Sequence, residues 1–168
     1  DQPINWQVLT QNKNIRQSDV IYNWDTIGLE GHYTLQLVVE DFTNEQVIEK
    51  RQITVDNTPP LVEITFPESD SIVSGNLQIV GIATDNHFDS YLLQQAKGTN
   101  PASSDWQTIG GVRISQINQG ILGQFLTATV ADGIYSLRLE VTDKVGQIST
   151  VFRTITIDNT PPRVMLQS

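Results

Sequence analysis

The feature that most limits what this chain can fold into is an internal repeat. The string Asp-Asn-Thr-Pro-Pro occupies residues 56–60 and recurs unchanged at residues 158–162, an offset of 102 residues. Other segments match at the same offset, namely residues 31–41 with 133–143 and residues 51–55 with 153–157. Because these matches share one offset, the sequence predicts two copies of one module that is about 100 residues long.

The two copies differ in completeness. Trp6 aligns with Trp106 at an offset of 100 residues, yet five residues precede Trp6 whereas 45 residues separate Pro60 from Trp106. The first copy therefore lacks the counterpart of this front half, which a longer array or another chain would supply. The predicted parts are the C-terminal half of a first module at residues 1–57, a complete module at residues 58–158, and a linker with the first strand of a following module at residues 159–168.

Short segments of alternating polarity predict an all-β fold. In residues 134–141, apolar side chains at every second position point to one face and polar side chains point to the other. The other predicted strands of the complete module are residues 61–66, 77–82, 91–95, 106–109, 121–130 and 151–157. Seven short strands separated by turn residues, with no helical stripe, are typical of an antiparallel β-sandwich.

A tyrosine near the start of the clearest strand narrows the kind of sandwich. Tyr33 and Tyr135 each follow a glycine by two positions. This is the position of the tyrosine corner in immunoglobulin-like (Ig-like) sandwiches, in which the phenol bonds back to the preceding loop. The predicted fold class is therefore all-β, with Ig-like antiparallel β-sandwich repeats, one complete and one partial.

These residues also carry a family resemblance. The motif Gly-x-Tyr-Thr/Ser-Leu-x-Leu, followed by Asp41 or Asp143 and a strand ending in Asp-Asn-Thr-Pro-Pro, resembles the bacterial Ig-like repeats of cell-surface and secreted proteins. It also resembles the Ig-like modules that trail some envelope enzymes, including penicillin-binding transglycosylases. The resemblance covers residues 24–166, although the Asp-x-x-Gly-Asn that usually follows the tyrosine strand is only half kept. It implies a spacer, an adhesive module or an accessory domain.

The linker motif has its own physical meaning. Asn-Thr-Pro-Pro leaves the last strand of one module and enters the first strand of the next. Each proline fixes its φ angle and lacks an N–H group, and the residue before each proline is extended. We therefore expect a short, stiff connection that holds modules end to end with little bending. A plain strand terminator is a compatible explanation of the same residues.

Composition excludes several classes of function. The chain has 10 Lys and Arg against 19 Asp and Glu, a formal net charge of −9, so we expect no nucleic-acid partner. No apolar run approaches the roughly 18 residues of a membrane span. The absence of Cys excludes disulfides, thiolate metal sites and cysteine nucleophiles. No carboxylate pair stands out and no Gly-x-Ser-x-Gly motif occurs, so the chain is predicted not to be an enzyme.

A polar cluster is predicted where the chain enters the complete module. In an Ig-like sandwich, the loops after the second strand and after the tyrosine strand lie at this pole, which brings Asp85 and Asp143 towards Asp56 and Asn57 of the linker. Oxygen ligands from separate loops suit Ca²⁺, so these four residues form a candidate calcium site and Ca²⁺ is the candidate cofactor. The alternative is that each side chain caps a turn through local backbone bonds.

Three tryptophans allow a second kind of site. Trp6, Trp24 and Trp106 are candidates for a carbohydrate-binding face, because aromatic rings stack on sugar rings. The alternative is a packing role. Trp24 aligns with Leu126, which we expect to point inward, and Trp6 and Trp106 recur at equivalent positions.

These features predict a non-catalytic, extracytoplasmic Ig-like spacer or adhesion module of a larger bacterial surface or envelope protein. The alternative is a carbohydrate- or protein-binding accessory module attached to a cell-wall enzyme. The expected partners are neighbouring Ig-like modules of the same chain, with a carbohydrate or a partner protein under the alternative. The strand edges of the half module also predict that it leans on the complete module or forms a strand-exchanged homodimer.

Overall fold

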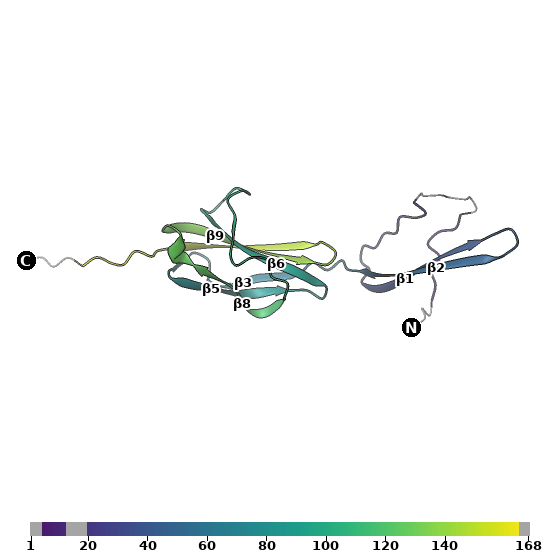
Figure 1. Ribbon diagram of the computed structural model, residues 1–168, viewed down its shortest axis with the longest axis horizontal. Helices are drawn as coiled ribbons and strands as arrows, with labels where there is room; N and C mark the ends of the chain where they lie inside the picture. Colours follow the sequence, from purple (N-terminus) through teal and green to yellow (C-terminus); the bar gives the residue numbers. More distant parts are fainter. Residues whose placement is uncertain (1–4, 13–19, 165–168) are drawn as a thin grey trace, which may run out of the picture. The chain divides into compact units, whose positions relative to one another are not determined.

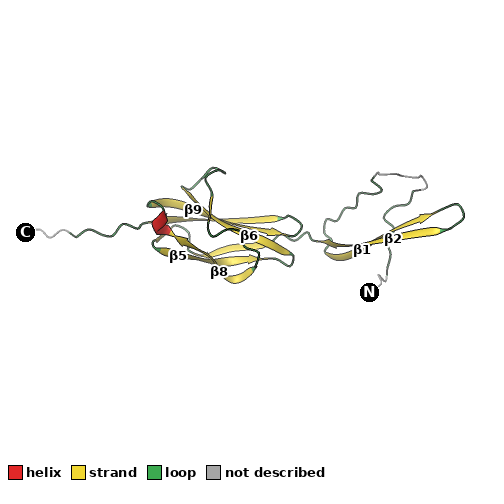
Figure 2. Cartoon of the chain, viewed as in Figure 1, coloured by secondary structure: helices red, strands yellow, loops and turns green. Residues whose placement is uncertain are grey.

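The computed structural model of this chain describes residues 5–12 and 20–164. It divides into two compact units, Asp1–Thr58 and Pro59–Ser168, and each unit is considered by itself. Both units are built from β-strands (Figures 1 and 2). Within the described residues, no helix has the length and apolar content that crossing a membrane requires.

The second unit is a sandwich of two sheets. Its strands are β3 (Leu61–Phe66), β4 (Ser71–Val73), β5 (Asn76–Thr84), β6 (Phe88–Lys97), β7 (Gln107–Thr108), β8 (Ile117–Leu126), β9 (Gly133–Asp143) and β10 (Ile148–Ile157). One sheet has the order β4-β10-β9-β6-β7 and the other has the order β3-β5-β8. The strands pair antiparallel except β4, which runs parallel to β10. The predicted all-β, Ig-like antiparallel sandwich is confirmed.

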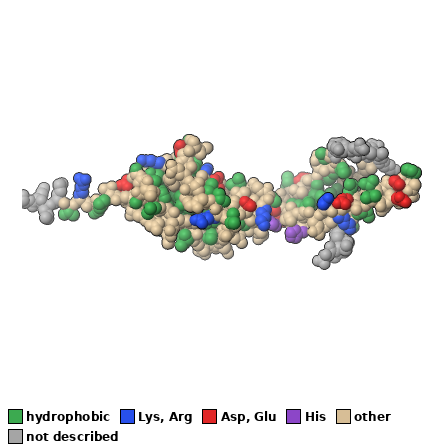
Figure 3. Space-filling view, in the orientation of Figure 1, with side chains coloured by type: hydrophobic (Ala, Val, Ile, Leu, Met, Phe, Trp, Pro, Cys, Tyr) green, Lys and Arg blue, Asp and Glu red, His purple; other side chains and the backbone are tan. Residues whose placement is uncertain are grey.

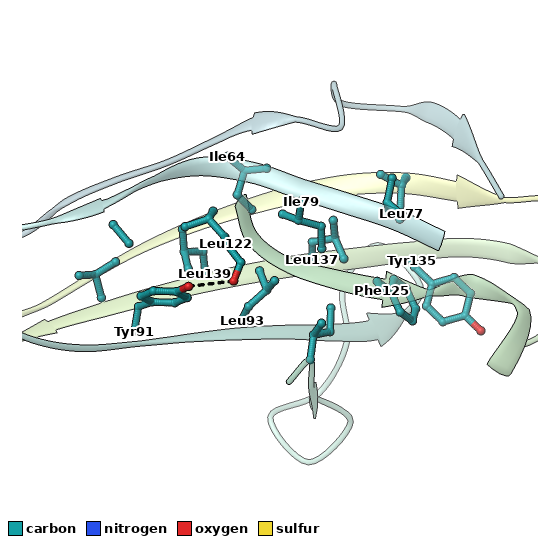
Figure 4. Packing of buried hydrophobic residues seen from close by; sticks show 14 of the residues in the cluster. Ile64, Leu77, Ile79, Tyr91, Leu93, Leu122, Phe125, Tyr135, Leu137 and Leu139 are labelled. Carbon is teal, nitrogen blue, oxygen red and sulfur yellow. Dashed lines mark hydrogen bonds between the residues drawn. The ribbon is translucent and has the colours of Figure 1, made fainter. Parts of the chain in front are cut away.

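The core lies between the two sheets, and the alternation of β9 explains its position. Leu137, Leu139 and Val141 occupy every second position of β9 and are fully buried. They belong to one apolar cluster with Ile64 of β3 and Ile79 of β5 from the opposite sheet (Figure 4). Burying one large aliphatic side chain stabilises a fold by about 1.5–3 kcal/mol. The contact between these faces is therefore the main stabilising contact of the unit.

The tyrosine corner is present at the start of β9. The Tyr135 hydroxyl donates a hydrogen bond to the carbonyl oxygen of Ala131, four residues upstream, at 3.0 Å. The Tyr135 ring packs edge-on against Phe125, with 6.5 Å between the ring centroids. A second buried tyrosine, Tyr91 of β6, donates to the carbonyl oxygen of Leu122 at 2.8 Å and so links the two sheets (Figure 4).

Two segments differ from the sequence-based expectation. The strand predicted at residues 121–130 is instead β8, which starts at Ile117 and ends at Leu126, followed by a 3-10 turn at Thr127–Thr129. The Thr127 N–H still donates to the carbonyl oxygen of Gly75 in the register of β5 and β8, and the turn is closed when the Val130 N–H donates back to the carbonyl oxygen of Thr127. The three-residue strand β4 was not predicted, since a segment this short shows no alternation and depends on its pairing with β10.

The first unit contains a hairpin of β1 (Gly31–Glu40) and β2 (Gln46–Val55). Its antiparallel register runs from Gly31 opposite Val55 to Glu40 opposite Gln46. The β9–β10 hairpin of the second unit has the same register 102 residues later, from Gly133 opposite Ile157. The matched segments of the sequence therefore form hairpins of the same register.

Gly81 of β5 lies opposite Ile64 of β3, where the backbone of β3 passes close to it. A Cβ atom on Gly81 would lie 2.0 Å from the carbonyl oxygen of Glu63 and 2.9 Å from a Leu122 methyl carbon. We expect Gly81→Ala to lower the free energy of unfolding by about 3 kcal/mol, measured by urea denaturation, because the backbone of β3 must move. The matched control is Gly120→Ala on β8, whose nearest neighbour is a side-chain atom at 3.4 Å. Equal losses for the two variants would contradict this packing.

Candidate functional site at the linker motif

The second copy of the linker motif is bound to its own module. Asn159 lies two residues beyond β10, and its side-chain Nδ2 donates to the carbonyl oxygen of Thr127 at 3.1 Å. Its Oδ1 accepts hydrogen bonds from the Thr127 hydroxyl at 2.9 Å and from the Gly75 N–H at 3.3 Å. One amide side chain thus joins the end of β10 to the turn after β8 and to the loop before β5.

An acidic residue completes this arrangement. Asp132 lies directly before β9, and its Oδ1 accepts the Asn159 backbone N–H at 2.8 Å. Its Oδ2 accepts the Thr160 hydroxyl at 2.6 Å. The Thr160 hydroxyl and then the Asn159 N–H hold the pKa of Asp132 below its ordinary value of 3.8.

The first copy repeats these bonds within the first unit. The carboxylate of Glu30 accepts the Asn57 N–H at 2.7 Å and the Thr58 hydroxyl at 2.9 Å. The Asn57 side-chain Nδ2 donates to the carbonyl oxygens of Thr26 at 2.7 Å and Leu29 at 2.8 Å. We call each set of bonds a linker cluster: the Asn and Thr of the motif, the acid before the glycine, and the turn carbonyl that accepts the amide.

The linker cluster explains why Asn and Thr stand before the two prolines. A strand that ends at a proline leaves its last polar backbone groups without a ladder partner, and such groups need another one. In both copies the acid accepts the backbone N–H of the motif Asn, and the Asn side-chain amide donates to a carbonyl oxygen of a turn. Sequence reasoning treated the motif as a linker and as a source of calcium ligands, and it missed the roles of Glu30 and Asp132. The available signal was an acid immediately before Gly31 and Gly133, at the same offset as the rest of the repeat.

Asp143, one of the predicted calcium ligands, closes the β9–β10 hairpin. It is almost fully buried, and its Oδ1 accepts the N–H groups of Val145 and Gln147, each at 2.9 Å. Its Oδ2 accepts the Gln147 side-chain amide at 3.0 Å. Asp41 does the same in the first unit, accepting the N–H groups of Thr43 and Glu45 at 2.8 and 3.0 Å. Turn capping therefore accounts for Asp143 without a metal.

The other predicted ligands also make local bonds. Asp85 accepts the His87 N–H at 2.6 Å, and Asp56 accepts the Thr58 N–H at 3.2 Å. Both are bonds to the second residue along the chain, the pattern of an Asx turn. Asp56 and Asn57 lie in the first unit, whereas Asp85 and Asp143 lie in the second. The convergence of these four residues on Ca²⁺ stays a prediction.

Trp6 and Trp106 have matching neighbours. The Trp106 ring packs against Phe152, with 5.9 Å between ring centroids, and the Arg138 guanidinium lies 4.5 Å from its centroid. The Trp6 ring has the Lys50 ammonium 5.4 Å from its centroid. Lys50 and Phe152 are 102 residues apart, so the same position covers the ring in each copy. A sugar stacked on Trp106 would compete with these neighbours, which favours the packing role.

Trp24 is half-buried in the first unit, and its predicted alignment with Leu126 is wrong. Leu126 is 53% exposed and points outward, whereas the preceding residue, Phe125, is buried. The Trp24 ring packs edge-on against Tyr33 at 5.2 Å, as Phe125 packs against Tyr135. The equivalent of Trp24 is therefore Phe125, at an offset of 101 residues. The alignment failed because a one-residue shift in a strand exchanges its inner and outer faces.

Comparison with known proteins supports an Ig-like domain. Residues 16–96 match the family model described as bacterial Ig-like domain (group 3), a span that begins in the first unit and ends within β6. No curated protein matches the chain. Among solved structures, an endo-beta-1,4-mannanase from Thermotoga petrophila is similar at 12% identity and a TM-score of 0.45. The alignment covers 62% of this chain and 21% of the mannanase chain.

The second linker cluster predicts a stability effect. Asn159→Ala removes the side-chain bonds to Thr127 and Gly75 and leaves the carbonyl oxygen of Thr127 without that donor. We expect the free energy of unfolding to fall by about 2 kcal/mol in urea denaturation, because partly buried polar groups lose their partners. Asn100→Ala, in an exposed loop, is the matched control and should change it by less than about 0.5 kcal/mol. Equal effects of the two variants would argue against the cluster.

The lowered pKa of Asp132 predicts a pH effect with a definite sign. A carboxyl whose pKa is lower in the folded state stabilises that state when it is ionised. This contribution is present above pH about 4 and is lost as the pH falls through the lowered folded value. We expect Asp132→Asn to lower the melting temperature at neutral pH and to differ less from the wild type as the solution is acidified. A difference that is the same at every pH would rule out this linkage.

Proposed function

We propose that this chain is a non-catalytic, extracytoplasmic Ig-like spacer of a larger bacterial surface or envelope protein. The observation that carries the proposal is the linker cluster, which occurs with the same chemistry at residues 57–58 and 159–160. The bacterial Ig-like match supports the broader role of an accessory module. The net charge of −9 is consistent with a soluble surface protein.

The chain leaves each unit through residues that are held in place. In both copies the Asn and the Thr are hydrogen-bonded to their own unit, and two prolines follow at once. The prolines hold φ near −65° and push the residue before each of them into an extended conformation. Few rotatable bonds therefore remain between the last bonded residue and the next strand. A spacer needs such a connection, because a freely rotating joint would not hold its ends apart.

The spacer role predicts a narrow distribution of distances between the units. The chain has no Cys, so the pair Gln52→Cys and Thr150→Cys, both exposed strand positions, places two spin labels specifically. Pulsed electron resonance should give one narrow distance peak, and Asn57→Ala should broaden it, because the first linker cluster loses its amide bonds.

Asn100→Ala in the same labelled chain is the matched control and should leave the peak unchanged. A broad distribution in the parent chain, or no broadening by Asn57→Ala, would reject the spacer role. Repeating the measurement in millimolar Ca²⁺ tests the candidate ligands Asp56, Asn57, Asp85 and Asp143. An ion held by both units would narrow the peak further and raise the melting temperature, and the lack of both effects would rule out the calcium site.

A further inference from the structure

The β1–β2 hairpin carries apolar side chains that its counterpart buries. Leu37 and Val39 are 43% and 56% exposed, whereas the residues 102 positions later, Leu139 and Val141, are fully buried. The two pairs occupy the same places in hairpins of the same register. Hydrophobic side chains reach the surface of the first unit in the space-filling view (Figure 3). We call the face that bears Leu37 and Val39 the hairpin face.

The second unit shows what covers such a face. Ile64 of β3 and Ile79 of β5 belong to the same buried cluster as Leu139 and Val141 (Figure 4). In addition, β6 pairs antiparallel along the outer edge of β9, and β4 pairs along the outer edge of β10. Within residues 5–12 and 20–58, β1 and β2 pair only with each other. The hairpin therefore has an apolar face and two strand edges, and it is the equivalent face and edges of the β9–β10 hairpin that are covered in the second unit.

The first unit already holds the counterparts of the later part of the module. Trp24 packs on Tyr33 as Phe125 packs on Tyr135. Trp6 lies beside Lys50 as Trp106 lies beside Phe152. The part that has no counterpart is residues 61–105, which contain β3, β4, β5 and β6 and lead directly into Trp106.

We propose that the hairpin face binds the front half of an Ig-like module, a segment joined ahead of Trp6 as residues 61–105 are joined ahead of Trp106. One strand of this segment adds to the free edge of β1, as β6 adds to β9, and its apolar strands cover Leu37 and Val39, as β3 and β5 cover Leu139 and Val141. Burial of these side chains and pairing of the edge supply the binding energy. The inference does not depend on the spacer role.

The test is a chain in which a copy of residues 61–105 replaces residues 1–5, directly ahead of Trp6. We expect the amides of residues 35–39 to exchange with solvent at least about tenfold more slowly than in the unmodified chain, because they enter a cooperative sandwich. The matched control carries Ile64→Asp and Ile79→Asp in the added copy alone, and it should not slow the exchange.

Amide exchange measured on the unmodified chain can contradict the proposal. If residues 35–39 are already as strongly protected there as residues 137–141, the hairpin face has another occupant and the proposal fails. A doubled mass in light scattering would then identify a second copy, including a strand-exchanged dimer. A single mass would identify the rest of the same chain.

A second variant keeps the proposal testable if the extended chain folds poorly. Leu37→Ser should leave the urea midpoint of the unmodified chain unchanged, because that side chain is exposed, whereas Leu139→Ser should lower it strongly. Equal losses from the two substitutions would overturn the proposal. In an extended chain that folds, Leu37→Ser should become as destabilising as Leu139→Ser.

Discussion

Apolar contact between the two sheets holds the second unit together. The chain contains no Cys, so no disulfide joins the sheets, and the inner face of β9 packs directly on β3, β5 and β8. Hydrogen bonds also join the two sheets: the Tyr91 hydroxyl donates to the Leu122 carbonyl oxygen, and the Arg153 guanidinium donates to the Ile64 carbonyl oxygen. The same dependence explains the first unit. A hairpin of identical register leaves Leu37 and Val39 exposed, because no second sheet covers it within residues 5–12 and 20–58.

The ends of the strands follow a second rule, which concerns hydrogen bonds rather than apolar area. Asp41 and Asp143 close the hairpins by accepting backbone N–H groups of the turn. Glu30 and Asp132 close the opposite ends by accepting the N–H group of the linker Asn. Every one of these acids lies where backbone groups would otherwise lack partners. Several acids of this acidic chain therefore have structural roles that involve no ligand.

This division of roles bears on function. A module whose acids close turns and strand ends, and whose tryptophans pack against neighbouring side chains, is suited to presenting or spacing other parts of a protein. The Ig-like sandwich hosts many functions, so the proposed spacer role depends on the linker cluster and not on the fold. The hairpin face adds a requirement: an apolar face and two strand edges must meet matching strands before the first unit resembles the second.

Much of this architecture followed from the order of the residues. The alternation in residues 134–141, the tyrosine before it and the 102-residue repeat predicted the sandwich, because strand periodicity and repetition are local properties of the chain. The roles of Glu30, Asp132 and Phe125 needed the tertiary structure. Glu30 and Asp132 meet the linker 27 or 28 residues later, and the equivalence of Trp24 with Phe125 depends on which face of a strand turns inward. Such pairings are set by how strands stack in space, which a residue pattern does not encode by itself.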